Sequence, residues 1–149
     1  MIEFAMLLPI SIFFLLFIFN IGSAVLVDNV LNDAVYTAAQ LSAQTGAVDP
    51  NAVRAAIDQT MTNLGPGYSP ANLTVTQAGV TNVAGFGNSN VCTSGVGGYT
   101  MVRVSASYNY PMIPGLGALI NMIGGGGASF SSSLTLNSTG VARCEIARQ

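Results

Sequence analysis

The first part of the chain is an unbroken apolar segment. Residues 4–27 carry no charged side chain, and large aliphatic and aromatic residues occupy most positions. As an α-helix this segment is about 36 Å long, which is enough to cross the hydrocarbon core of a bilayer. Apolar side chains surround such a helix on all sides, so it must lie in lipid or be enclosed by protein.

Three sites interrupt this apolar pattern. Pro9 removes one backbone hydrogen bond and favours a kink, and Asn20 places an amide among apolar neighbours. Gly22 and Ser23 form the place where a bend or local unwinding is most expected. The alternative is the ordinary tolerance of membrane helices for such residues. A cleavable signal peptide is a further alternative for the segment. It requires a basic start and a shorter apolar core, whereas the first three residues here include an acid and no base.

The helical pattern continues beyond residue 27. Apolar residues recur at steps of three and four through residues 28–46, with Asp, Asn and Gln between them. Gly46 is a typical C-terminal stop, so the pattern predicts one helix of roughly 40 residues. A second helix begins at Asp49, an N-cap acid, with Pro50 in its first turn, and ends at residues 65–67.

The second half of the chain predicts a small antiparallel sheet. Residues 73–76 alternate between apolar and polar, and so do residues 99–110, whose apolar face is Val102, Val104, Ala106 and Tyr108. Pro111 and Pro114 are expected to end the second of these strands. The predicted fold class is therefore α+β: a long hydrophobic helix extends into a small domain with a second helix and an antiparallel β-sheet.

Less regular segments lie around these strands. Residues 84–98 are rich in Gly, Asn and Ser and predict a long loop. The pattern at residues 116–123 predicts a short helix or a hydrophobic loop. The glycines at residues 124–127 predict a flexible hinge. Residues 130–136 and 141–146 predict two final strands, which the turn-forming Ser-Thr-Gly run at 138–140 separates.

Composition excludes several classes of function. Half of the 149 residues are apolar and only 7% are charged, against roughly 25% in ordinary soluble domains. A net charge of −2 without Lys argues against nucleic-acid binding. His is absent, which removes the commonest general base and metal ligand. Because no nucleophile–base pair is visible either, the sequence predicts no enzyme, no metal site and no cofactor.

Cys92 and Cys144 are the two thiols. In an exported domain a disulfide between them is the default, and closing a loop of this length stabilises by about 4 kcal/mol. Two buried free thiols are the alternative. Asn72 and Asn137 each begin a glycosylation triplet, which is a weak motif. The Gly-rich runs at 115–117 and 124–127 lack the Lys-Ser/Thr of a phosphate loop and predict turns.

Glu3 is the most informative single residue. Placing an ionised carboxylate at the end of a membrane-spanning helix costs a few kcal/mol of free energy unless a cation pairs with it. The first basic side chain is Arg54, about 75 Å further along a continuous helix. The nearby cation is therefore an α-amino group, its own or that of a neighbouring copy. The alternative is a solvated acid at the helix start, which the helix dipole favours.

The distribution of Arg raises a question of topology. All four Arg follow the apolar segment, which would place the body of the protein in the cytoplasm. The low charge, the two Cys and the many Ser, Thr and Asn of that body instead indicate export. The two indications agree if a short basic leader precedes Met1 in the precursor and is removed.

The opening residues resemble a known family. Residues 2–9 read IEFAMLLP, which is similar to the VEFALVLP opening of TadE-like proteins, pseudopilin-related components of the Tad (Flp) pilus system. A processed hydrophobic helix with a glutamate near its start is also the type IV pilin pattern. There the glutamate is the fifth mature residue, whereas here it is the third. Residues 105–111, SASYNYP, resemble the VSYPY strand end of TadE-like chains.

The resemblance implies a structural subunit that polymerises into an extracellular pilus filament through its first helix. Residues 1–27 would form a membrane and filament-core helix, 28–46 its amphipathic continuation, and 47–149 a small exported α+β domain. The residues expected at subunit contacts are Glu3, Phe4, Pro9, Asn20 and Gly22.

Expected partners are other copies of the chain and, before assembly, the inner membrane. A prepilin peptidase and a pilus assembly platform are implied by the family, and no nucleic acid is expected. The expected location is a filament at the cell surface, formed from a membrane-anchored precursor. Two alternatives stay open: a minor pseudopilin that primes or caps a filament, and a membrane-anchored exported domain that does not polymerise.

Overall fold

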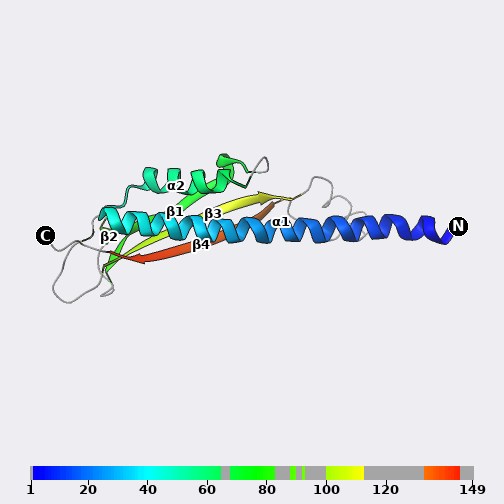
Figure 1. The fold of residues 1–149 in the computed structure, drawn as a ribbon, viewed down its shortest axis with the longest axis horizontal. Helices are drawn as coiled ribbons and strands as arrows, with labels where there is room; N and C mark the ends of the chain where they lie inside the picture. Colours follow the sequence, from blue (N-terminus) through cyan, green and yellow to red (C-terminus); the bar gives the residue numbers. More distant parts are fainter. Residues whose placement is uncertain are drawn as a thin grey trace. The chain divides into compact units, whose positions relative to one another are not determined.

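A computed structural model describes residues 2–64, 68–82, 88–89, 92, 100–112 and 133–144; for 2–6, 9, 81–82 and 88–89 it describes the backbone only. Two helices and a β-sheet confirm the predicted α+β class (Figure 1). The chain divides into two compact units. Unit 1 contains Met1–Val27 and Tyr110–Leu134, and unit 2 contains Asp28–Asn109 and Thr135–Gln149.

The first helix is longer than an ordinary globular helix. α1 runs through 44 residues, Ile2–Thr45, and is about 66 Å long. Gly46 follows with a φ of 71°, a left-handed conformation that ends a helix and favours glycine. The predicted helix and its stop are therefore confirmed. The local unwinding considered at Gly22 and Ser23 is wrong, because α1 stays helical there and the Ser23 hydroxyl donates to the Phe19 carbonyl at 2.8 Å.

The second helix, α2, spans Pro50–Thr62 and begins as predicted. The Asp49 carboxylate accepts a hydrogen bond from the Asn51 backbone N–H at 2.9 Å, which satisfies one of the free donors of the first turn. Proline in that turn loses nothing, because its missing N–H has no partner there. One face of α2 is buried, formed by Val53, Ile57 and Met61.

The sheet has the strand order β2-β1-β3-β4. Its strands are β1 (Leu73–Asn82), β2 (Asn88–Ser89), β3 (Thr100–Pro111) and β4 (Ser133–Arg143), and a 3₁₀ turn, η1 (Pro70–Asn72), precedes β1. β1 pairs antiparallel with β2 and with β3. Hydrogen bonds from Thr135 to Asn109 and between Thr139 and Ser105 show that β4 also runs antiparallel to β3. The predicted antiparallel sheet is therefore confirmed.

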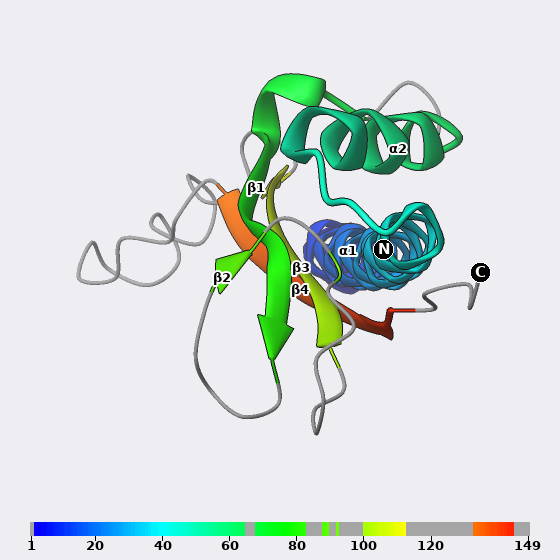
Figure 2. The same ribbon diagram turned by 90° about the vertical axis from the view of Figure 1, so that its left-hand side faces the viewer.

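The core of unit 2 lies between one face of the sheet and the two helices (Figure 2). The alternation predicted for β3 is confirmed, since Val102, Val104, Ala106 and Tyr108 are all buried. The opposing positions of α1 are small or aliphatic, which lets the helix approach the sheet closely. They are Leu31, Ala34, Val35, Ala38, Ala39 and Ala43.

Three strand predictions need correction. The two final strands expected at 130–136 and 141–146 are one strand, β4, which passes straight through residues 138–140. β1 continues to Asn82 instead of ending at residue 76. β3 ends at Pro111, as predicted. The loop expected at 84–98 contains β2. The segments expected at 116–123 and 124–127 lie outside the described residues.

Tyr108 and Tyr68 close one end of this core. Their rings stack with centroids 5.6 Å apart, and the Tyr68 hydroxyl donates to the Asp58 carboxylate on α2. Burial and this hydrogen bond to Asp58 raise the pKa of Tyr68. The phenol therefore keeps its proton at physiological pH, and the segment before η1 stays joined to α2 through a charge-assisted hydrogen bond.

Gly140 sets the distance between β4 and α1. A Cβ atom at this position would lie 2.7 Å from the Val35 carbonyl oxygen and 3.0 Å from the Tyr36 Cα. Two residues earlier, the buried Ser138 hydroxyl donates to the Asn32 side-chain oxygen at 2.6 Å. The Ser-Thr-Gly run is therefore the contact of a strand with a helix and not a turn.

We expect Gly140→Ala to lower the free energy of unfolding by about 3 kcal/mol, because every atom that the new methyl group meets belongs to a backbone. The measurement is a urea titration of the full chain in a nonionic detergent. Gly79→Ala on β1 is the matched control, since a Cβ there meets nothing within 4 Å and should change stability by no more than about 0.5 kcal/mol. Equal losses for both variants would contradict the close approach.

Candidate functional site

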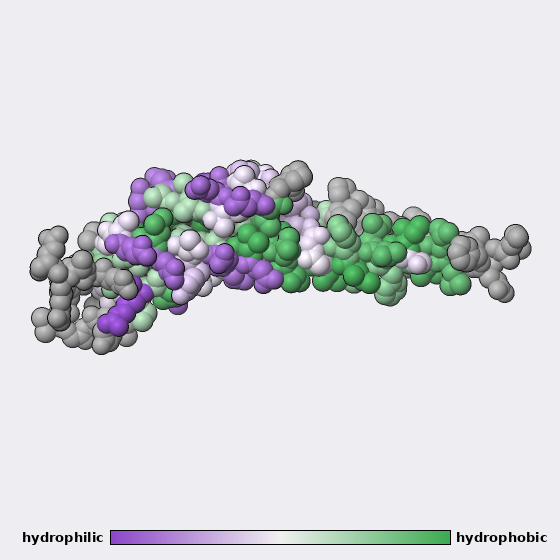
Figure 3. Space-filling model, in the orientation of Figure 1, coloured by the Kyte–Doolittle hydropathy of each residue, from purple (hydrophilic) through white to green (hydrophobic). Residues whose placement is uncertain are grey.

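The most unusual surface of the molecule is the first half of α1. Between residues 7 and 26 its large apolar side chains are exposed on most sides, and this surface is mostly hydrophobic in the view of Figure 3. Within the described residues, α1 is the one helix long and apolar enough to cross a membrane. Only 6% of its apolar window is buried, unlike the core helix of a soluble protein. Water is a poor solvent for this surface, so lipid or protein must cover it.

One side of this segment forms a regular seam with alternating steps of four and three residues. We call it the outer seam, and it consists of Leu8, Ile12, Leu15, Phe19, Gly22 and Leu26. Leu15 and Phe19 are 67% and 70% exposed, the largest values among the exposed apolar side chains. Gly22 leaves a gap in the seam, because a Cβ there would meet nothing within 4 Å. Seams with this spacing are how helices pack against one another.

The other side of α1 is covered by its own chain. Within unit 1, Asn20, Ala24 and Val27 are buried, again at steps of four and three residues. At 100° per residue, Asn20 and Gly22 point about 200° apart around the helix. The sequence groups these two residues as interruptions of one apolar pattern. The structure separates them into a buried position and an exposed one.

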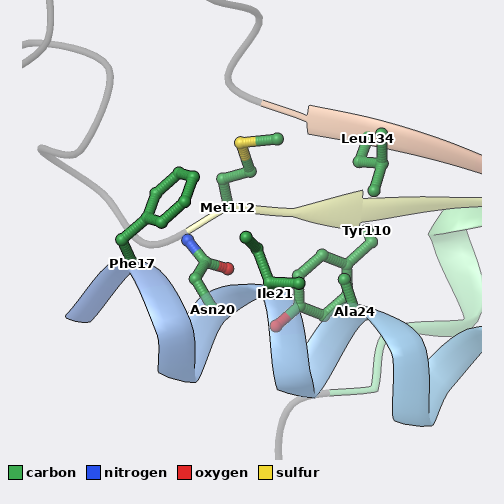
Figure 4. Close-up of a pocket in the computed structure, with 7 residues that line it drawn as sticks. All are labelled: Phe17, Asn20, Ile21, Ala24, Tyr110, Met112 and Leu134. Carbon is green, nitrogen blue, oxygen red and sulfur yellow. The ribbon is translucent and has the colours of Figure 1, made fainter. Parts of the chain in front are cut away.

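A pocket of about 80 Å³ lies beside Asn20 within unit 1 (Figure 4). Apolar atoms line its open surface. The residues that form its walls come from α1, from the end of β3 and the residue after it, and from β4. They are Phe17, Asn20, Ile21, Ala24, Tyr110, Met112 and Leu134.

Asn20 carries an unsatisfied donor at this pocket. Its side chain is 5% exposed, and its Nδ2 atom has no hydrogen-bond partner in the structure of the described residues. Figure 4 shows the amide pointing away from the helix axis toward the Met112 side of the pocket. A buried amide left without a partner costs about 1–3 kcal/mol. This cost disappears if the amide turns toward the pocket and meets an acceptor there.

The remaining residues singled out from the sequence are dispersed. α1 contains Glu3, Phe4 and Pro9, and the structure describes only the backbone of these three residues. Asn72 ends η1, and Asn137 is exposed on β4.

Cys92 and Cys144 form a disulfide. The Cys92 N–H donates to the Gly46 carbonyl at 2.8 Å, and the Cys144 N–H donates to the Thr100 carbonyl at 3.0 Å. The bond therefore ties the C-terminal end of α1 to the end of the sheet.

The described ranges contain no group of three or more His, Cys, Asp or Glu that could hold a metal ion. The distinctive features are the exposed outer seam and the apolar pocket with its unpaired amide. Both are features of a surface that packs against another surface.

Residues 1–40 match the family model of TadE-like proteins. The resemblance drawn from the opening residues is therefore confirmed over that segment, which covers α1 up to residue 40. It relates the chain to pilin-like proteins associated with the Tad pilus, a family that is structural and not enzymatic. Together with the apolar helix, it indicates a membrane-anchored or surface protein. No curated protein and no solved structure matches the chain significantly.

Proposed function

We propose that this protein is a structural subunit that polymerises into an extracellular, Tad-like pilus filament through α1. The observation that carries the proposal is the exposed apolar surface of α1 between residues 7 and 26. Such a surface must be covered by lipid or by other protein, and a bilayer and a bundle of like helices each supply that cover. A pilin uses both in succession.

Before assembly the apolar part of α1 spans the inner membrane, and unit 2 lies outside the cytoplasm. The helix then leaves the bilayer and packs against the helices of other copies. Burying such a helix is worth tens of kcal/mol relative to water at about 25 cal/mol per Å². Relative to lipid the gain is far smaller, because the helix is already out of water. Assembly therefore draws on specific packing, on pairing of Glu3 with a neighbouring α-amino group, and on external work.

The composition of the domain agrees with this function. The disulfide between Cys92 and Cys144 suits an oxidising compartment outside the cytoplasm. The uncovered face of the sheet is mainly polar, with Ser105, Ser107 and Thr139 on it, and the described strands carry two charged residues, Arg103 and Arg143. Such a face tolerates close neighbours without charge repulsion. The matched family implies two further partners, a prepilin peptidase and an assembly platform.

The test is electron microscopy of material sheared from cells that produce the full chain, with its composition determined by mass spectrometry. We expect filaments in which this chain is the main component. A few copies in filaments built from another chain would instead show a minor pseudopilin that primes or caps them. Recovery from the membrane fraction alone would show an anchored domain that does not polymerise.

A further inference from the structure

The pocket beside Asn20 limits what can enter it. Its volume of about 80 Å³ suits one large apolar side chain, and apolar atoms line its open surface. A buried water molecule normally needs two to four polar partners, whereas the Asn20 amide is the one unpaired buried side-chain group among the described residues. The occupant is therefore an apolar side chain that arrives together with a hydrogen-bond acceptor.

The outer seam of a second copy offers both of these features. Phe19 is its most exposed side chain. At Gly22, one turn further along, the missing side chain leaves the helix backbone open, because nothing lies within 4 Å of where a Cβ would be. Helix carbonyls beside such a glycine can accept a hydrogen bond from a polar side chain on a neighbouring helix.

The pocket and the outer seam lie on opposite sides of α1. Phe17 and Ile21, which flank the pocket, point roughly 160° away from Phe19 around the helix. One copy can therefore present its pocket to one neighbour and its outer seam to another. A contact between two different faces is heterologous, so it can repeat from copy to copy, as an open filament requires, instead of joining two copies in a closed dimer.

We propose that, in the assembled protein, the pocket of one copy receives Phe19 of the next copy, and that the Asn20 amide turns toward the pocket and donates to a helix carbonyl beside Gly22 of that copy. This contact rests on the proposed function, because it operates between copies in a filament. It specifies which two faces of α1 meet and at what depth along the helix.

Cysteine cross-linking tests the contact in the full chain. Two differently tagged variants, Phe19→Cys and Ile21→Cys, are produced in the same cells, and assembled material is oxidised and separated on a non-reducing gel. The native thiols are already paired with each other. We expect a disulfide-linked pair that carries both tags, and no pair when either variant is produced alone. Ile18→Cys replaces Ile21→Cys in the control, because Ile18 is more exposed than Ile21 (62% against 50%) and lies within one turn of it, but belongs to neither face.

A second variant tests the hydrogen bond itself. Asn20→Leu keeps the apolar character of the helix and removes the donor. We expect it to lower the yield of the Phe19–Ile21 cross-link by about three- to thirtyfold, the range for one hydrogen bond between membrane helices. An unchanged yield would overturn the role of Asn20.

The outcomes separate this contact from the proposed function. Filaments that form without the mixed cross-link, or that cross-link equally well through Ile18, overturn the contact and leave the filament in place. Cross-linking of Phe19→Cys to itself shows a contact between like faces and also overturns it. If the wild-type chain forms no assembled material at all, the proposed function fails and the contact fails with it.

Discussion

Removing the disulfide between Cys92 and Cys144 is expected to lower the free energy of unfolding by about 4 kcal/mol. The two residues are 52 positions apart, so the bond removes the entropy of a long loop from the unfolded chain. The bond also has local support in the fold. Cys92 is hydrogen-bonded to Gly46 after the end of α1, and Cys144 to Thr100 at the start of β3. Without the bond, neither of these hydrogen bonds joins the end of α1 to the sheet, and only the packing of α1 against the sheet remains.

The measurement is the free energy of unfolding of the full chain in nonionic detergent, from urea titrations with and without a reducing agent. A double variant, Cys92→Ala with Cys144→Ala, is the control, because it excludes pairing with the wrong thiol. Both routes should give the same loss. A loss below about 1 kcal/mol would show that the contacts of β4 with α1 hold the domain without the bond.

The elements with a strong periodic pattern are the ones that sequence alone predicts well. Buried residues recur at helical spacing in α1 and α2 and at every second position on the inward face of β3. The end of α1 at Gly46 and the N-cap of α2 at Asp49 follow from the local chemistry of these residues. In these places local preference and tertiary packing favour the same structure.

The errors occur where tertiary contacts override local preference. In β4, Ser138 and Gly140 have the composition of a turn, yet one donates to Asn32 and the other lets the strand approach Val35. A single sequence carries no signal for the position of a helix more than 100 residues earlier in the chain. In β1 the register shifts between Val75 and Gln77. A bulge of this kind breaks the two-residue period by which a strand is recognised.

The candidate site shows the same division. The hydrophobic pattern predicts that α1 must be covered, but it does not distinguish the side covered by its own chain from the side left open. That distinction depends on where Tyr110, Met112 and Leu134 lie against α1. The signal that could have been used is the spacing of Asn20 with Ala24 and Val27, which continues into the buried positions from Leu31 onward. Asn20 on this row indicates a polar group inside a packed interface.

Replacing Glu3 by Ala is expected to reduce filament yield at least about tenfold while leaving membrane insertion unchanged. The carboxylate stands at the start of a helix whose next 24 residues carry no charge. In the proposed filament this carboxylate pairs with the α-amino group of an adjoining copy when helices pack side by side. Removing the carboxylate leaves that cation without its counter-ion at the edge of an apolar helix bundle, which costs a few kcal/mol, and each 1.4 kcal/mol is about a factor of ten in association.

Glu3→Gln is the matched control, since it keeps the shape and the hydrogen-bonding capacity of the side chain and removes only its charge. If ion pairing drives the effect, the Gln variant fails as the Ala variant does. If the Gln variant assembles normally, a hydrogen bond is sufficient. Yield is measured as sheared filament mass per cell, and insertion as the amount of chain in the membrane fraction. Normal filaments from Glu3→Ala would show that this acid is a solvated residue at the helix start, favoured by the helix dipole, and has no part in assembly.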